Sequence, residues 1–201
     1  MKVLCDYLNK LYIYPLINNR SMNKPEYFIA IIPPKEYTEK IIQFQKRWKN
    51  NSLPNIVEPH ITLKSQAGLE NGMNWLDPVK AICKSFSPFK LTISGVKTFG
   101  TSVVYLSIIS AEIYELHRKI VGAVAPDPEL SKKYFELDLY KPHLTLGLSE
   151  FGMSGDELMN MKEQAKMHLN IFPPFIVNRV RLFGLENGKY QKIEDIELKQ
   201  I

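Results

Sequence analysis

Apolar residues follow two different periods along the chain, and the alternation between these periods predicts a protein with both strands and helices. The run 27–32 (YFIAII) is rich in aromatic and β-branched residues and ends at Pro33 and Pro34, which predicts a buried strand. Over 35–50, apolar residues recur every three or four positions, as they do on one face of an amphipathic helix. Both signals return several times before the end of the chain.

The remaining elements follow from the same two periods and from the turn residues between them. In the first half of the chain we expect a strand at about 59–65, a helix at 76–86 with Pro78 near its start, and two strands on either side of Gly100. A helix at 111–124, a strand within 140–149 and a helix at about 154–169 should follow. The chain should end in two strands, at 175–185 and 190–198, joined by a turn at Asn187-Gly188. The polar stretch 125–134 is expected to be a long connection.

The expected elements repeat in the order helix, strand, helix, strand, strand. The repeat extends to individual residues, because PF at 88–89 is matched by PF at 174–175, and VKTFG at 96–100 is matched by VRLFG at 180–184. We infer an internal duplication of about 80 residues. Two such lobes, related by a pseudo-twofold axis, would place their equivalent strands face to face.

Each half of the chain also carries one copy of Pro-His-aliphatic-Thr-Leu, as PHITL and as PHLTL. The chain has four histidines, and the two in these motifs lie 83 positions apart (143 minus 60), in step with the duplication. Because side chains alternate between the faces of a strand, His60 and Thr62 share one face, as do His143 and Thr145. The surface between the lobes therefore presents two imidazoles and two hydroxyls.

Two imidazoles and two hydroxyls suit an in-line displacement at phosphorus. Imidazole titrates near neutral pH, so one histidine can accept a proton while the other donates one, and the threonines can hydrogen-bond the phosphate oxygens. We favour His143 as the base and His60 as the acid. A metal site is the competing interpretation, although two histidines without a carboxylate cluster fall short of a usual zinc ligand set. His117 and His168 lack the motif, fall in expected helices, and are interpreted as structural or solvated.

Composition changes this picture only slightly. Lysine and arginine outnumber aspartate and glutamate by 26 to 21, and the net charge of +5 suits a polyanionic ligand without identifying one. Four basic residues lie near the motifs or on the paired strands, and they are candidates for substrate binding with solvated surface positions as the alternative: Lys64, Lys97, Lys141 and Arg181. Cys5 and Cys83 have no CxxC neighbour, which argues against a disulfide scaffold and a cysteine zinc site.

The first 21 residues contain no signal-peptide core, because Asp6, Asn9 and Lys10 interrupt their apolar positions. No stretch reaches the about 18 to 20 apolar residues of a membrane span. We therefore expect a cytoplasmic protein without membrane contact. In this interpretation 1–21 form a dispensable N-terminal extension, and 22–201 form a single bilobal domain.

With these motifs, residues 25–198 resemble the two-histidine (2H) phosphoesterases, the superfamily of bacterial 2′,5′-RNA ligase-like proteins and cyclic phosphodiesterases. The resemblance rests on EPHITLK, on KPHLTLG, and on the TFGTSVVYLSI and LHRKI stretches between them, and it extends in particular to the small YjcG-like phosphoesterases. It implies an α+β fold, bilobal with a pseudo-twofold duplication. Two antiparallel sheets would line a central, positively charged cleft, with the helices outside.

The resemblance also implies an activity. The expected reaction is the hydrolysis, without metal or cofactor, of a 2′,3′-cyclic phosphate or a related cyclic nucleotide or RNA-end phosphodiester. His60 and His143 take the acid and base positions, and Thr62 and Thr145 bind the phosphate. Members of the family differ in reaction, so two alternatives stay open: a catalytically silent module that binds nucleotides or RNA ends, and a 2′,5′-RNA ligase. We expect a monomer.

Overall fold

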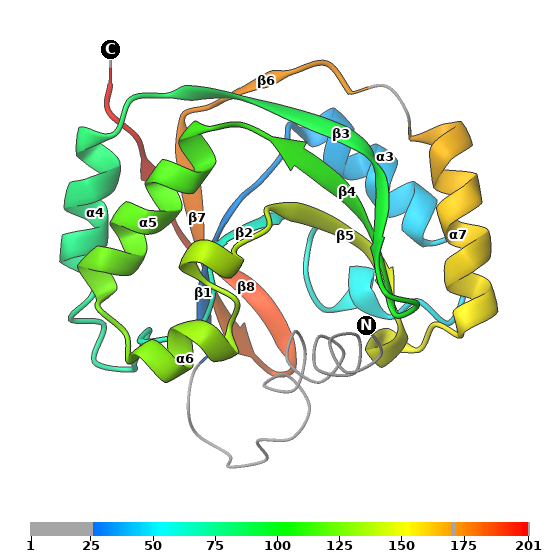
Figure 1. The fold of residues 1–201 in the computed structure, drawn as a ribbon, viewed down its shortest axis with the longest axis horizontal. Helices are drawn as coiled ribbons and strands as arrows, with labels where there is room; N and C mark the ends of the chain where they lie inside the picture. The colour runs from blue at the N-terminus through cyan, green and yellow to red at the C-terminus, as the bar shows by residue number, and fades with distance from the viewer. Residues whose placement is uncertain (1–25, 170–171, 201) are drawn as a thin grey trace.

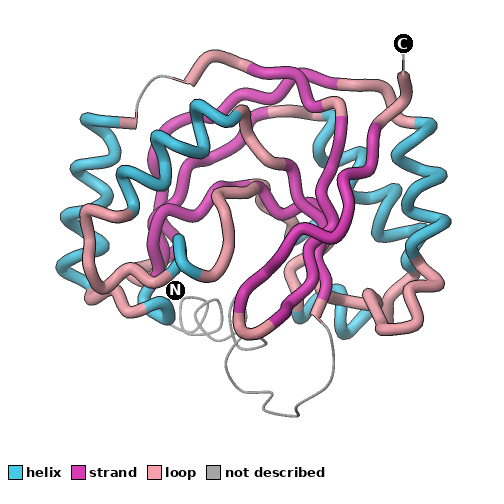
Figure 2. The backbone as a smooth tube through the Cα atoms, turned by 180° about the vertical axis from the view of Figure 1, so that it is seen from behind, coloured by secondary structure: helices cyan, strands magenta, loops and turns pink. Residues whose placement is uncertain are grey.

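The computed structural model describes residues 26–169 and 172–200, so the expected extension 1–21 lies outside the described residues. Within those ranges, eight strands form one antiparallel sheet in the order β6-β3-β4-β5-β2-β1-β7-β8. The strands are β1 Tyr27–Ile31, β2 Ile61–Lys64, β3 Phe89–Phe99, β4 Val103–Ile109, β5 His143–Leu148, β6 Phe175–Val177, β7 Arg179–Glu186 and β8 Lys189–Glu197. The sheet is strongly curled, as Figures 1 and 2 show.

Helices pack outside the sheet at its two ends. They are α3 Lys35–Gln45, α4 Leu76–Ser85, α5 Glu112–Val124, α6 Pro128–Lys133 and α7 Gly155–His168. In Figure 1, α4 and α5 lie together at one end and α3 and α7 at the other. The fold is therefore α+β with helices outside, as expected.

The sheet consists of two four-stranded halves that meet where the two His-x-Thr strands meet. β2 and β5 pair through Ile61 and Leu144. Each half combines strands from both repeats, because β2 pairs with β1, which pairs with β7 of the second repeat, whereas β5 pairs with β4, which pairs with β3 of the first. The duplicated halves are thus interleaved, and the two expected sheets are continuous through one pair of residues.

The aliphatic residues of the two motifs hold this junction in place. Ile61, Leu63, Leu144 and Leu146 are fully buried in the main core, on the face that the helices cover. Period-2 alternation then puts the histidines and threonines on the opposite face. Burying four aliphatic side chains stabilises the strands by about 1.5–3 kcal/mol each, and fixes their register at the same time.

The expected turns and boundaries are mostly confirmed. Asn187 and Gly188 both have positive φ, 50° and 76°, which is the backbone of a two-residue hairpin turn. Helix α3 ends at Gln45, five residues before the end of the expected span. The long connection expected at 125–134 contains a short helix, α6, that was not predicted.

Helix α6 begins with residues that are typical of a helix N-terminus, but the helix is too short to show an amphipathic pattern in the sequence. The Asp127 side chain accepts a hydrogen bond from the Glu129 N–H, and Pro128 occupies the first helical position. Both are standard features of a helix N-terminus. With six residues and no apolar period, the helix gives no amphipathic signal.

Candidate active site

A cleft of about 190 Å³ opens on the face of the sheet opposite the main core, where β2 and β5 meet. His60, Thr62, His143 and Thr145 all line it, and all four are partly exposed. The structure thus brings together the two motifs that are 83 positions apart in sequence (143 minus 60). This confirms that the motif side chains share one surface.

A backbone carbonyl two residues upstream orients each imidazole. His60 Nδ1 lies 2.8 Å from the Glu58 carbonyl oxygen, and His143 Nδ1 lies 2.7 Å from that of Lys141. Because a carbonyl only accepts, both Nδ1 atoms carry the proton, and in the neutral rings the lone pair is on Nε2. The duplication therefore extends to the tautomer of the two histidines.

The His60 ring rests on stacked aromatic side chains. Its centroid lies 4.9 Å from that of Phe28, and Phe28 stacks on Phe183 with centroids 4.7 Å apart. Rings in such contacts restrict the rotation of the imidazole. The Nε2 atom is therefore held in one direction.

The His143 ring has an equivalent support. Tyr105 lies 5.2 Å from it and Phe99 lies 5.0 Å from it, and these two rings stack on each other at 4.2 Å. Phe99 and Phe183 are the phenylalanines of VKTFG and VRLFG. The matched sequences thus correspond to matched supports of the two histidines.

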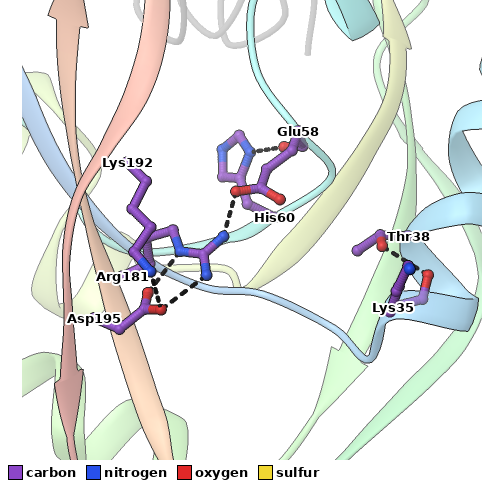
Figure 3. A network of polar contacts seen from close by, with 7 residues as sticks. All are labelled: Lys35, Thr38, Glu58, His60, Arg181, Lys192 and Asp195. Atoms are coloured by element: carbon purple, nitrogen blue, oxygen red, sulfur yellow. Dashed lines mark hydrogen bonds and ion pairs between the residues drawn. The ribbon is translucent and has the colours of Figure 1, made fainter.

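An ion-pair network distinguishes the His60 side of the site from the His143 side (Figure 3). Arg181 Nη1 donates to Glu58 Oε1 at 2.6 Å, while its Nε and Nη2 donate to the Asp195 carboxylate at 2.6 and 3.0 Å. Lys192 also binds Asp195, at 2.6 Å. Glu58, whose backbone carbonyl orients His60, is thereby held in place through its side-chain carboxylate. The corresponding residue before His143 is a lysine with an exposed side chain.

Burial lowers the pKa of both motif histidines. For His60, the pKa falls below its usual value because of desolvation, although the hydrogen bond and the negative charge of Glu58 act in the opposite direction. For His143, desolvation is the main cause that lowers the pKa to about 4; the hydrogen bond to the Lys141 carbonyl acts in the opposite direction, and the positive charge of a protonated His60 acts in the same direction as desolvation. Glu58 therefore favours a proton on His60, and His60 in turn disfavours one on His143.

Side chains from outside the sheet brace both motif strands. Tyr140 Oη donates to the Thr62 carbonyl at 2.8 Å, and Gln45 Nε2 donates to the Thr145 carbonyl at 3.2 Å. These backbone positions lie beside the junction of the half-sheets, where strand pairing is sparse. The bonds replace the missing strand partners and keep the threonines in place.

Of the four candidate basic residues, the structure brings Lys141 to the cleft. Lys97 is exposed on β3 and does not line the cleft. Arg181 is occupied by Glu58 and Asp195, as described above. Among the described residues that line the cleft, the charged side chains are Lys141 and Glu136, and their charges are opposite in sign. The positively charged cleft that the resemblance implies is therefore not observed among these residues.

Lys64 does not reach the surface expected for it. Its ammonium is fully buried, lies 2.6 Å from Glu136 Oε1 and also donates to the carbonyls of Ser65, at 3.1 Å, and Ala67. Three acceptors satisfy its three N–H groups. The structure thus gives this lysine a structural partner in place of the predicted substrate.

The two remaining histidines lie in helices, as predicted. His117 in α5 is buried; its Nδ1 donates to the Leu63 carbonyl at 2.7 Å, and its Nε2 accepts from the Leu137 N–H at 2.8 Å. Burial lowers its pKa to about 4. His168 is exposed at the end of α7. His117 is therefore structural, although its ring contributes to the cleft wall.

Sequence reasoning missed two acidic residues of the site, Glu58 and Glu136. Glu58 could have been found from the sequence, because it lies only two positions before His60. Glu136 had none, because it lies in an irregular segment between α6 and β5. Among the described residues, no group of three or more histidine, cysteine or acidic side chains is placed to hold a metal ion.

The sequence model of the 2′-5′ RNA ligase superfamily matches residues 33–182. Among solved structures, E. coli LigT complexed with 3′-AMP has a TM-score of 0.57 and 16% sequence identity, over 89% of this chain and 100% of that one. TT0787 of Thermus thermophilus has a TM-score of 0.60 and 16% identity, over 87% and 98%. A structure described as a phosphoesterase has a TM-score of 0.57 and 17% identity, over 89% and 100%.

At these identities the structural likeness establishes the fold. No curated protein sequence matches the chain. In the described part of the chain, no helix has both the length and the apolarity that a membrane span requires.

Proposed function

The chain belongs to the 2′-5′ RNA ligase superfamily, and we propose that within it this protein is a metal-independent phosphoesterase that hydrolyses a 2′,3′-cyclic phosphate of a nucleotide or RNA end. The observation that carries the proposal is the pairing of two imidazoles in one cleft, each with Nδ1 bound to a carbonyl. Solved structures of E. coli LigT with 3′-AMP and with phosphate agree with such a ligand.

The proposed reaction is a single in-line displacement. His143 Nε2 accepts a proton from water, and the water oxygen forms a bond to phosphorus. The bond from phosphorus to one ribose oxygen breaks, and His60 Nε2–H donates a proton to that leaving oxygen. The ring opens to a phosphomonoester, and each histidine ends in the protonation state in which the other began. Proton exchange with solvent restores the starting state.

The assignment of roles follows from the differing surroundings of the two rings. The low pKa of His143, about 4, keeps it unprotonated and able to accept a proton at neutral pH. The carboxylate of Glu58 favours the protonated form of His60, which the leaving oxygen requires. A bound phosphate anion raises the pKa of both rings. We therefore assign the base to His143 and the acid to His60.

Three further groups are suited to hold the phosphate. The Thr62 and Thr145 hydroxyls line the cleft beside the imidazoles, and the Lys141 ammonium adds positive charge at its mouth. Hydrogen bonds to a charged oxygen contribute about 1.5–3 kcal/mol each. These groups stabilise the charge that develops on the non-bridging oxygens.

The proposal is tested by incubating the protein with the four 2′,3′-cyclic nucleotides in excess chelator and following products by phosphorus NMR. We expect phosphomonoester formation that persists in chelator and is lost in H60A and in H143A. H168A is the matched control, because this histidine is exposed and does not line the cleft. Activity that disappears on chelation would overturn the metal-independent scheme, and joined RNA ends without hydrolysis would favour a ligase.

A further inference from the structure

One wall of the cleft carries a group of polar side chains whose role the phosphate chemistry does not explain. Ser65 and Gln66 follow β2, and Tyr134 and Glu136 precede β5. All four line the same cleft as the histidines. We call these four residues the polar wall. A ligand held at the histidines by its phosphate has this wall within the same cavity.

Hydrogen bonds within the protein use the donors of the polar wall. Ser65 Oγ donates to Glu136 Oε1 at 2.7 Å, and Tyr134 Oη donates to Gln66 Oε1 at 3.1 Å. The Gln66 amide group donates to Glu26 at 3.0 Å and to Tyr190 at 2.9 Å. What the wall retains for a ligand are the lone pairs of its oxygens. The ligand group that binds here must therefore bring N–H or O–H donors.

Glu136 supplies the strongest of these acceptors. Its side chain is 1% exposed, and its Oε1 accepts hydrogen bonds from Lys64, at 2.6 Å, and from Ser65. Its Oε2 is buried and has no hydrogen-bond partner among the described residues. Leaving a buried carboxylate oxygen unsatisfied is costly, so the arrangement is stable only if something compensates for it.

The backbone holds Glu136 in this position at a further cost. Phe135 and Leu137, on either side of it, have φ of 54° and 56°, a region that residues other than glycine rarely adopt. The Leu137 N–H is fixed by His117 Nε2 at 2.8 Å. Backbone strain of this kind persists only where many surrounding contacts enforce it, and it is found most often at functional sites.

We propose that Glu136 Oε2 accepts a hydrogen bond from the amino group of a nucleobase, so that the cleft selects cyclic nucleotides with an amino-bearing base over those with uracil. The proposal rests on the phosphoesterase function proposed above. Cytosine and uracil are nearly the same shape, but cytosine presents an N4 amino donor where uracil presents the O4 acceptor. Facing a buried carboxylate oxygen, the uracil O4 is repelled and Oε2 stays unsatisfied. The Tyr134 ring lines the same cleft and offers a flat surface on which a base can stack.

The direct test compares kcat/KM for 2′,3′-cyclic CMP and 2′,3′-cyclic UMP. We expect the cytidine substrate to be preferred by about 10- to 100-fold, as for the loss of one hydrogen bond to a charged group. In E136Q the amide oxygen can replace Oε1 for Lys64 and Ser65, which places the amide NH₂ where Oε2 was. The preference should then reverse in favour of uridine. The matched control is E129Q, the same change at an exposed residue of α6, which should keep the wild-type preference.

The outcomes separate this inference from the proposed function. Equal kcat/KM for the two substrates, or a preference that E136Q leaves unchanged, would overturn the inference while the phosphoesterase activity stands. If E136Q does not fold, the wild-type comparison decides alone. If no cyclic nucleotide is hydrolysed, calorimetric titration with 3′-CMP and 3′-UMP decides: tighter binding of 3′-CMP supports the role of Glu136, and equal or absent binding removes it.

Discussion

At the scale of single residues, the two halves of the site carry the same Pro-His-aliphatic-Thr-Leu motif but differ in the residues that surround it. Each histidine has the same tautomer and the same kind of aromatic support, yet an acidic residue orients His60 and a lysine orients His143. The negative charge of Glu58 opposes the desolvation that lowers the pKa of His60. The division into acid and base thus comes from residues outside the repeated Pro-His-aliphatic-Thr-Leu.

These pKa shifts predict an acidic pH optimum for kcat/KM. The base must be unprotonated, so the rate falls as pH drops through its pKa; the acid must be protonated, so the rate falls as pH rises through its pKa. Both pKa values lie below the usual 6.5 of histidine, so the maximum should lie below pH 6.5. The two limbs report the pair of histidines as a unit. A pH profile with its maximum above 7 would show that the rings are not desolvated as described.

A single substitution near His60 should move one limb of that profile. In E58Q the carboxylate that favours protonated His60 is gone, so the pKa of His60 falls and the alkaline limb moves to lower pH. The acid limb should change little, because the hydrogen bond of His143 is to Lys141. E197Q, at an exposed residue of β8, is the control and should leave both limbs in place. An alkaline limb that does not move would assign the acid to another group.

At the scale of elements, strands β7 and β8 position Glu58, which belongs to neither strand. Arg181 on β7 and Asp195 on β8 are paired in the sheet register, and the arginine extends from there to Glu58. The approach to His60 is thereby tied to the hairpin of the second repeat. Such supports set the geometry of an acid or base to fractions of an ångström.

Loss of this tie should lower turnover more than stability. In R181Q the Glu58 carboxylate loses its partner and His60 loses a fixed carbonyl, so we expect kcat to fall about 10- to 100-fold with little change in KM. The pH profile should change as well, which a purely structural role would not produce. R179Q is the matched control on the same strand, because its contact with Glu197 is exposed and 3.9 Å long. Equal kinetics for the two variants would remove Arg181 from the account.

Turn glycines give a test of the fold at the same scale. In G188A the side chain has open space but φ is 76°, so we expect a loss of about 1–2 kcal/mol in the free energy of unfolding. In G152A a Cβ would also overlap the Asn50 carbonyl oxygen at φ of 96°, so the loss should be larger. G95A, with neither constraint, is the control. Urea denaturation that ranks G152A as the mildest of the three would contradict the described backbone.

The sequence predicted elements whose signal is local and missed those whose signal is not. The strand of Tyr27–Ile31 and the Asn187-Gly188 turn depend on neighbouring residues, and both are confirmed. The His-x-Thr faces followed from period-2 alternation. Glu136 was out of reach, because its importance comes from Lys64, a residue 72 positions away (136 minus 64). Lys64 was misplaced for the same reason: a strand pattern shows the face of a side chain and not its partner.

At the scale of the whole molecule, the two repeats are joined by the pairing of strands from both repeats and by a buried ion pair. Lys64 ends β2 of the first repeat, and Glu136 lies just before β5 of the second; both side chains are almost fully buried. Glu136 of this pair also lines the cleft that the histidines share. The geometry of the pair therefore affects both the stability and the shape of the site.

Breaking this pair from one side should destabilise the whole molecule. K64A leaves the Glu136 carboxylate buried without a cation, which costs about 3–5 kcal/mol in the free energy of unfolding. K35A is the control, since its partner Glu39 is exposed and 3.7 Å away, and such pairs contribute about 1 kcal/mol or less. Chemical denaturation measures both. Equal losses would mean that Lys64 is hydrated in solution.

The central claim is that the two repeats contribute one histidine each to a single catalytic unit, and a double-mutant comparison tests it most directly. Turnover of a 2′,3′-cyclic nucleotide in excess chelator is measured for wild type, H60A, H143A and H60A/H143A. We predict that each single variant loses about 10²- to 10⁴-fold in kcat, and that the double variant loses little more than either single, because the two rings act in the same step. A single variant that keeps near-wild-type turnover, or losses that multiply in the double variant, would contradict the two-histidine mechanism.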